Sequence, residues 1–213
     1  MINSENEKTK SKSLVRIQNL FDLVLAISMT LLVHDLFIPA GSISADNLSV
    51  FEALKSLRLT FLNYFISFFI LSGFWIMNNQ ELKLLKKADL PFLWLNLLNM
   101  FLLALLPVST SLKDFYAYVP LAEIVFHINK LLINLLIFFR WLYVIKNPDL
   151  LDLNCSDKVT IHSYYQKSKP GFITSLIAIG LSFLIPGMSS IVYFIFPVIL
   201  VLHRRHKTGR FMK

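Results

Sequence analysis

Long apolar segments, separated by short charged ones, run through most of the chain. Four of these segments are long enough to cross a bilayer as helices, which takes ~20 mostly apolar residues. A fifth apolar segment, 171–202, has no charged residue and carries the turn signal Pro186-Gly187 near its centre. We therefore expect an all-α integral membrane protein with six transmembrane helices. The predicted spans are about 14–38, 59–80, 90–112, 119–145, 171–185 and 188–202.

The composition agrees with this pattern. Apolar residues make up 55% of the 213 residues and charged residues only 16%, and the mean hydropathy is +0.61, which is outside the range of soluble domains of this size. A single cysteine, Cys155, excludes an intrachain disulfide and a cysteine-based metal cluster. We expect one membrane domain, residues 14–202, between a polar N-terminal tail at 1–13 and a basic C-terminal tail at 203–213.

The charges test this topology. Six spans place 17 of the 21 Lys and Arg residues on one side of the membrane, and the positive-inside rule makes that side cytoplasmic. We therefore expect a multi-pass protein of the plasma membrane with both termini in the cytoplasm. The net charge of +8 is then explained by topology and anionic lipid, not by nucleic acid. The basic segments are 1–16, 80–89, 140–169 and 203–213, whereas Lys55, Arg58 and Lys113 are expected outside.

The first predicted helix has one apolar stripe. At about 100° per residue, five of its side chains fall within a sector about 80° wide, and Arg16 extends the stripe towards the start of the helix. Asp22 points well away from this stripe, so Arg16 and Asp22 cannot pair along one face. The stripe fits either a packing seam with polar contacts or the wall of a pore. Its members are Leu20, Leu23, Ile27, Leu31 and His34.

The fourth predicted helix has a polar stripe instead. Glu123, His127, Lys130 and Asn134 follow i, i+4, i+7 and i+11 spacing and share one face. Interhelical hydrogen bonding is the more common reason for such a stripe, and a path for protons or cations is the alternative. The segment 156–169 after this helix is expected to be a solvated connector.

No compact catalytic motif occurs in the chain. HExxH, GxSxG, Walker A and GxGxxG are all missing, so we do not expect an enzyme. The histidines also lack the spacing of a metal site, apart from His203 and His206 in the basic tail.

The segment RIQNLFDLVLAISMTLLVHD, together with three later apolar segments, resembles the transmembrane protein 175 family of potassium channels, in its prokaryotic six-helix form. The family signature has an Arg, three residues and Phe-Ser-Asp before an apolar stretch, and RIQNLFDLVLAISMTLLVHD is similar to it. YFISFFILSGFWIMNN is similar to the second family helix, WLNLLNMFLLALLPVSTSL to the third, and LSFLIPGMSSIVYFIFPVIL to the last two. Two departures occur: Leu20-Phe21 replaces the Phe-Ser pair, and Asn78-Asn79 replaces paired histidines after Trp75.

The resemblance implies a homotetramer in a lipid bilayer, with the first helix lining a central pore for monovalent cations. It implies a leak-type, potassium-permeable channel with a hydrophobic constriction in place of a carbonyl filter, and no cofactor or metal beyond the permeant potassium. Pore-lining residues would be Leu23, Ile27, Thr30, Leu31 and His34, with Asp35 at the outer mouth. A structural polar network would contain Arg16, Asp22, Trp75, Asn78 and Asn79.

His34 is the unusual member of the stripe, because an apolar side chain is common at this position in the family. It either faces the pore or turns aside to bond with Glu123 or the 40–50 loop. Two other functions stay open from the sequence. One is a proton or cation transporter that uses Glu123, His127 and Lys130, and the other is a non-conducting membrane scaffold.

Overall fold

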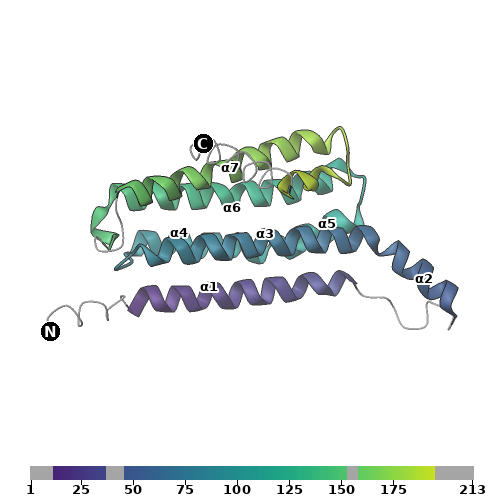
Figure 1. Cartoon of the computed structure of the whole chain (residues 1–213), viewed down its shortest axis with the longest axis horizontal. Helices are drawn as coiled ribbons and strands as arrows, with labels where there is room; N and C mark the ends of the chain where they lie inside the picture. The colour runs from purple at the N-terminus through teal and green to yellow at the C-terminus, as the bar shows by residue number, and fades with distance from the viewer. Residues whose placement is uncertain (1–11, 37–45, 153–157, 195–213) are drawn as a thin grey trace, which may run out of the picture.

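The helices lie nearly parallel in three layers (Figure 1). The structure is a computed structural model, and it describes residues 12–36, 46–152 and 158–194. Figure 1 shows α1 (Lys12–Leu31) with its 3-10 extension η2 (Leu32–Leu36) on one side; α3 (Arg58–Lys83), α4 (Leu90–Ala104) and α5 (Leu106–Phe115) in the middle; and α6 (Pro120–Lys146) and α7 (Lys158–Ser182) on the other side.

Among the described residues, four helical segments are long and apolar enough to cross a membrane, and they correspond to the first four predicted spans. A fifth apolar helical segment, Pro170–Ser182, is shorter. Most of the predicted sixth span, 188–202, and the basic tail, 203–213, lie outside the described residues, as do residues 1–11. The count of six spans therefore stays a prediction. The four segments are Lys12–His34, Arg58–Lys83, Leu90–Phe115 and Pro120–Lys146.

The third span contains a break that the sequence analysis did not predict. Residues 90–112 were expected to form one helix, but α4 ends at Ala104 and α5 begins at Leu106. Pro107 explains the break, because proline has no amide hydrogen and its ring clashes with the carbonyl oxygen four residues earlier. At the other end of α4, the Asp89 carboxylate accepts a 3.1 Å hydrogen bond from the Phe92 amide and caps the helix.

The prediction of a solvated connector at 156–169 is wrong from Lys158 onwards, because these residues belong to α7. This helix begins at Lys158 and continues through Pro170 to Ser182. The polar composition had suggested a loop, but polar residues are equally compatible with a helix that extends beyond the apolar zone. The turn predicted at Pro186-Gly187 is confirmed, since Gly187 has a φ of +90°, which favours glycine. The short helix η4 (Ser189–Ile191) follows the turn.

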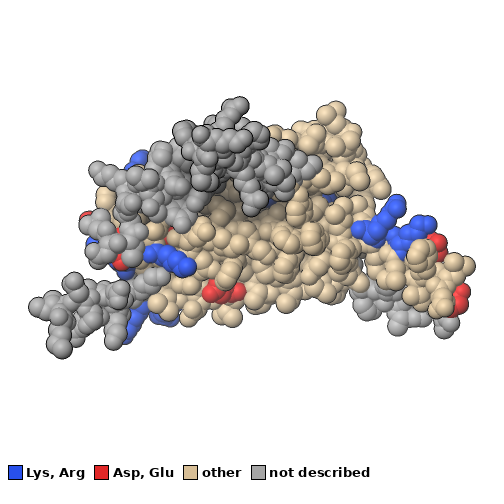
Figure 2. All heavy atoms as spheres, in the orientation of Figure 1, with Lys and Arg blue, Asp and Glu red and all other residues tan. Residues whose placement is uncertain are grey.

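Two connections that the sequence places on the same membrane side meet at one end of the bundle. Leu85, after α3, forms an isolated antiparallel bridge with Leu151, which follows the short helix η3 (Pro148–Leu150). The Lys86 amide donates to the Leu150 carbonyl oxygen at 2.9 Å. Figure 2 shows Lys and Arg residues gathered towards the two ends of the molecule, with a largely uncharged band between them.

A short helix outside the three layers was also not predicted. This helix, α2 (Asn47–Ser56), precedes α3 and projects from the end of the bundle (Figure 1). The Asp46 side chain caps it by accepting a 3.3 Å hydrogen bond from the Ser49 amide. It has no buried residue.

Candidate functional site

The two faces of α1 have opposite environments. One face is buried against α3, α4 and α5 and is mostly apolar: Leu14, Ile17, Phe21, Leu25, Ser28 and Leu32. On the other face, Leu23, Ile27 and Leu31 are 61%, 59% and 53% exposed. Leu20, Thr30 and His34 are also exposed. The subunit therefore leaves uncovered the stripe that the sequence analysis selected as a candidate pore wall.

The outer end of this stripe contains Thr30 and His34. The Thr30 hydroxyl donates a 2.8 Å hydrogen bond to the Ile27 carbonyl oxygen of its own helix. His34 lies in η2 and is exposed, and the described residues give it no hydrogen-bond partner. Glu123, one of its expected partners, bonds elsewhere, as described below. Asp35 is also in η2, but its side chain lies outside the described part of the structure.

Two side-chain hydrogen bonds connect α1 to α3 in the described residues. The Trp75 indole nitrogen donates to an Asp22 carboxylate oxygen at 2.8 Å, and the Gln18 amide nitrogen donates to the Asn79 side-chain oxygen at 3.3 Å. The structure thus brings together Asp22 and Trp75 of the expected polar network. Arg16 is exposed on α1.

Asn78, the remaining member of that network, faces α6 instead of α1. Its side-chain oxygen accepts a 2.9 Å hydrogen bond from Arg140 Nη2. Arg140 also forms an ion pair with Glu81, and both side chains are almost completely buried. The Arg140 guanidinium carbon lies 5.7 Å from the centre of the Phe92 ring. A charged group buried with a hydrogen-bonded partner of opposite sign fastens the two helices together.

Sequence reasoning missed this ion pair. Arg140 was counted among the cytoplasmic basic residues, and Glu81 was not considered. The signal that could have found them is position: Arg140 lies in the last turns of the fourth predicted span, and Glu81 directly follows the second, so both lie where predicted helices end at the same membrane side. Charges at such depth are costly without a partner.

Lys113, in α5, is a second buried cation. The sequence topology places it towards the outer side of the membrane, and inside the subunit it is only 2% exposed. Its ammonium group donates to Asn63 Oδ1 at 2.8 Å and to Ser190 Oγ at 2.7 Å. It also lies 5.1 Å from the centre of the Phe126 ring. Lys113 therefore joins α3 and α5 to the segment that follows the Pro186-Gly187 turn.

The polar stripe of α6 contacts the same segment. Glu123 accepts hydrogen bonds from the Gly187 amide and from the Ser189 hydroxyl. His127 Nε2 lies 2.7 Å from Ser189 Oγ, and His127 Nδ1 lies 2.8 Å from the Tyr193 hydroxyl oxygen. Because the Ser189 proton is directed to Glu123, we assign a neutral His127 that donates from Nε2 to Ser189 and accepts at Nδ1 from Tyr193.

The other two members of the stripe are also engaged inside the subunit. Lys130 Nζ lies 3.8 Å from the centre of the Tyr193 ring, and Asn134 Nδ2 donates to the Gly171 carbonyl oxygen at 3.1 Å. All four side chains thus hold α6 to α7 or to the segment after the turn, which supports the structural interpretation of the stripe. The described residues contain no group of three or more His, Cys, Asp or Glu side chains placed to hold a metal ion.

Comparison with known proteins finds a family model that is similar to the first half of these features. Residues 16–107 match the family model described as the endosomal/lysosomal potassium channel TMEM175. This match includes α1 from Arg16 onwards, the Asp22–Trp75 bond and the exposed stripe. The resemblance to the TMEM175 family is confirmed.

A potassium channel of Chryseobacterium sp. (strain P1-3) is 32% identical over 96 residues, which are 45% of this chain and 46% of that channel. The matched region therefore spans less than half of the relative's length. The fold is similar to the crystal structure of a lysosomal potassium-selective channel TMEM175 homologue from Chamaesiphon minutus, with a TM-score of 0.77. The structural match covers 91% of this chain and 98% of the Chamaesiphon chain. The sequence identity is 23%, so the match shows that the two chains share a fold. The TMEM175 relatives are potassium channels, which are not enzymes.

Proposed function

We propose that the chain is the subunit of a potassium-permeable, leak-type channel in which four copies surround a central pore. The exposed stripe of α1 carries this proposal. A spanning helix that buries one face in its own subunit and leaves Leu23, Ile27 and Leu31 uncovered needs a second environment for them. In a tetramer with α1 at the centre, these side chains form stacked rings along the axis.

The proposed rings set the conduction mechanism. Leu and Ile side chains cannot replace the hydration shell of an ion as carbonyl oxygens do. A ring of such side chains can exclude water and close the pore, and it conducts when it widens enough for an at least partly hydrated cation. Selectivity for potassium over sodium is then weaker than in a channel with a carbonyl filter.

His34 and Asp35 modify the outer end of the proposed pore. Asp35 carboxylates raise the local cation concentration at the mouth. His34 is exposed at the end of the stripe, and this position supports the pore-facing alternative of the two considered from the sequence. Four protonated imidazoles around the axis would repel cations, so we expect external acid to reduce the current.

The transporter alternative has less support. It requires Glu123, His127 and Lys130 to exchange protons or cations with water, yet these side chains are buried and engaged with Gly187, Ser189 and Tyr193. A non-conducting scaffold would leave the uncovered α1 stripe without a role other than contact with lipid or another chain.

Purified protein in planar bilayers under opposed potassium and sodium gradients tests the proposal. The wild type should carry a current whose reversal potential reports a preference for potassium. Ile27→Asn should wet the constriction and raise the conductance severalfold.

Ile128→Asn provides the matched control, because Ile128 is 43% exposed on α6 and lies away from the proposed axis. The control should conduct like the wild type. Equal conductance of Ile27→Asn and Ile128→Asn would contradict the assignment of α1 to the pore, and a silent bilayer for all three proteins would support the scaffold.

A further inference from the structure

The helix α2 presents a row of large apolar side chains that the described part of the subunit leaves exposed. Leu48, Phe51 and Leu54 are 70%, 61% and 59% exposed, and Val50 is also exposed. Polar residues occupy the opposite sector of the helix: Ser49, Glu52 and Ser56. The capping bond from Ser49 to Asp46 fixes where the helix begins. An exposed amphipathic helix of this kind needs an apolar surface or an interface beside it.

The junction between α2 and α3 preserves helical register. Leu57, the single residue between the helices, keeps right-handed helical backbone angles. Its amide donates to the Ala53 carbonyl oxygen at 3.3 Å, and its carbonyl oxygen accepts from the Phe61 amide at 2.8 Å. Hydrogen bonds four residues apart thus continue across the bend. The faces of α2 can therefore be followed directly onto α3.

The apolar face of α2 continues as an exposed stripe on the spanning helix. Spacings of four and seven residues place the stripe on one side of both helices. On α3 its members remain 41–57% exposed, although two of them also contact Phe194. The stripe consists of Val50, Leu54, Phe61, Phe65 and Phe69.

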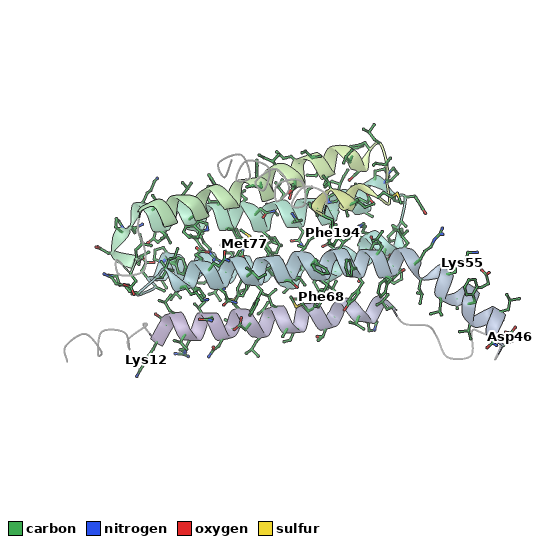
Figure 3. The ribbon with its side chains drawn as sticks, in the orientation of Figure 1. Lys12, Asp46, Lys55, Phe68, Met77 and Phe194 are labelled. Carbon is green, nitrogen blue, oxygen red and sulfur yellow. The ribbon has the colours of Figure 1, made fainter. Side chains whose placement is uncertain are left out.

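Charged residues mark the level at which this stripe leaves the membrane. Lys55 pairs with Glu52 at 3.8 Å near the end of α2, and Arg58 begins α3. Beyond Arg58 the spanning helix has no further charge until Glu81. Lysine and arginine at such a boundary place their charged ends among lipid headgroups while their stems stay on apolar surface. Figure 3 labels Asp46 and Lys55 on α2, which lies beyond the outer end of α1 and at an angle to the bundle.

We propose that α2 binds the interfacial zone of the bilayer, the boundary between headgroups and acyl chains, at the end of the bundle where α3 begins. Val50, Phe51 and Leu54 insert into this boundary, and Ser49, Glu52 and Ser56 face water. The continuity of the α2 face with the exposed stripe of the spanning helix α3 favours lipid over a neighbouring subunit. This assignment depends on membrane insertion alone and holds whether or not the protein conducts.

Site-directed spin labelling of the full-length protein in lipid nanodiscs tests the proposal. Cys155→Ser removes the only cysteine, and single cysteines are then introduced as Leu54→Cys, Glu52→Cys and Phe61→Cys. Collision rates of the label with oxygen, which prefers lipid, and with a water-soluble nickel chelate report the environment. The oxygen-to-nickel ratio should be severalfold higher at position 54 than at position 52 and should approach the ratio at position 61.

Two results would overturn the proposal. A label at position 54 as accessible to nickel as the label at position 52 would place the apolar face in water. A label at position 54 protected from both reagents would place it against protein, as in a contact between subunits. Ser49→Cys, on the polar face, gives a second water-facing reference if Glu52→Cys does not fold.

Discussion

The Trp75 indole of α3 donates a 2.8 Å hydrogen bond to the Asp22 carboxylate of α1. The bond lies on the side of α1 away from the exposed stripe, at the middle of the bundle. It therefore determines how α1 is rotated relative to α3 without occupying the proposed pore wall.

Replacing the donor should loosen α1. Trp75→Phe keeps an aromatic ring but removes the N–H group, and we expect a loss of about 1 kcal/mol in the free energy of unfolding, typical of interhelical hydrogen bonds in membranes. Denaturant titration in mixed micelles measures this loss. Trp94→Phe is the matched control, because Trp94 is 58% exposed. A stability loss for Trp94→Phe as large as that for Trp75→Phe would contradict the role given to the Asp22 bond.

Substitutions in the Glu81–Arg140 pair should lower the free energy of unfolding more than loss of the Trp75–Asp22 bond does. Removal of one partner leaves a buried charge without compensation, so Glu81→Gln or Arg140→Met should each cost about 3–5 kcal/mol. The double variant should cost less than the two single losses added together, since no uncompensated charge remains. The same denaturant titration yields the coupling energy, and simple additivity would show that the two groups do not interact.

Substitutions of Glu123 distinguish a structural role of this side chain from a role in ion transport. Glu123→Gln retains an oxygen that accepts from the Gly187 amide, so the channel should keep its current and lose little stability. Glu123→Ala removes the acceptor for both Gly187 and Ser189 and should destabilise the turn by about 1–3 kcal/mol. Bilayer recordings and hydrogen exchange of the Gly187 amide measure the two effects. Loss of ion flux in Glu123→Gln would favour the transporter.

The proposed position of His34 predicts a pH response. Imidazole is neutral at higher pH and gains a positive charge as pH falls, so the potassium current should be largest in alkaline external solution. Lowering the external pH from about 8 to about 5 should reduce the wild-type current, and His34→Leu should remove most of this dependence. An unchanged pH response in His34→Leu would place the histidine away from the pore.

Much of the fold follows from hydropathy alone. Runs of apolar residues located the first four spans because a helix in lipid must satisfy its own backbone and bury no charge without a partner. The Pro-Gly pair, not hydropathy, marked the turn at Pro186-Gly187. Hydropathy did not reveal the break before Pro107 or the beginning of α7 at Lys158, because neither changes the apolar content of a window of residues.

The candidate site was partly predictable for a similar reason. Helical periodicity selected Leu23, Ile27 and Leu31 as one face of α1, and this face is exposed in the subunit. Partners across helices follow from packing, which a sequence pattern does not contain. The topology assigned Lys113 and Arg140 to the two sides of the membrane but gave no partner for either, whereas each is buried with specific oxygen acceptors.

The distribution of polar contacts makes the subunit mechanically uneven. The buried ion pair, the Lys113 and Glu123 contacts and the Leu85–Leu151 bridge join α3, α5, α6 and the following turn into a stiff frame. Within the described residues, the contacts that join α1 to that frame are apolar packing and hydrogen bonds that include those of Asp22 and Gln18. Apolar surfaces slide over one another at lower cost than ion pairs separate. If α1 lines the proposed pore, the frame would be the stationary part, and rotation of α1 against it would change the bore.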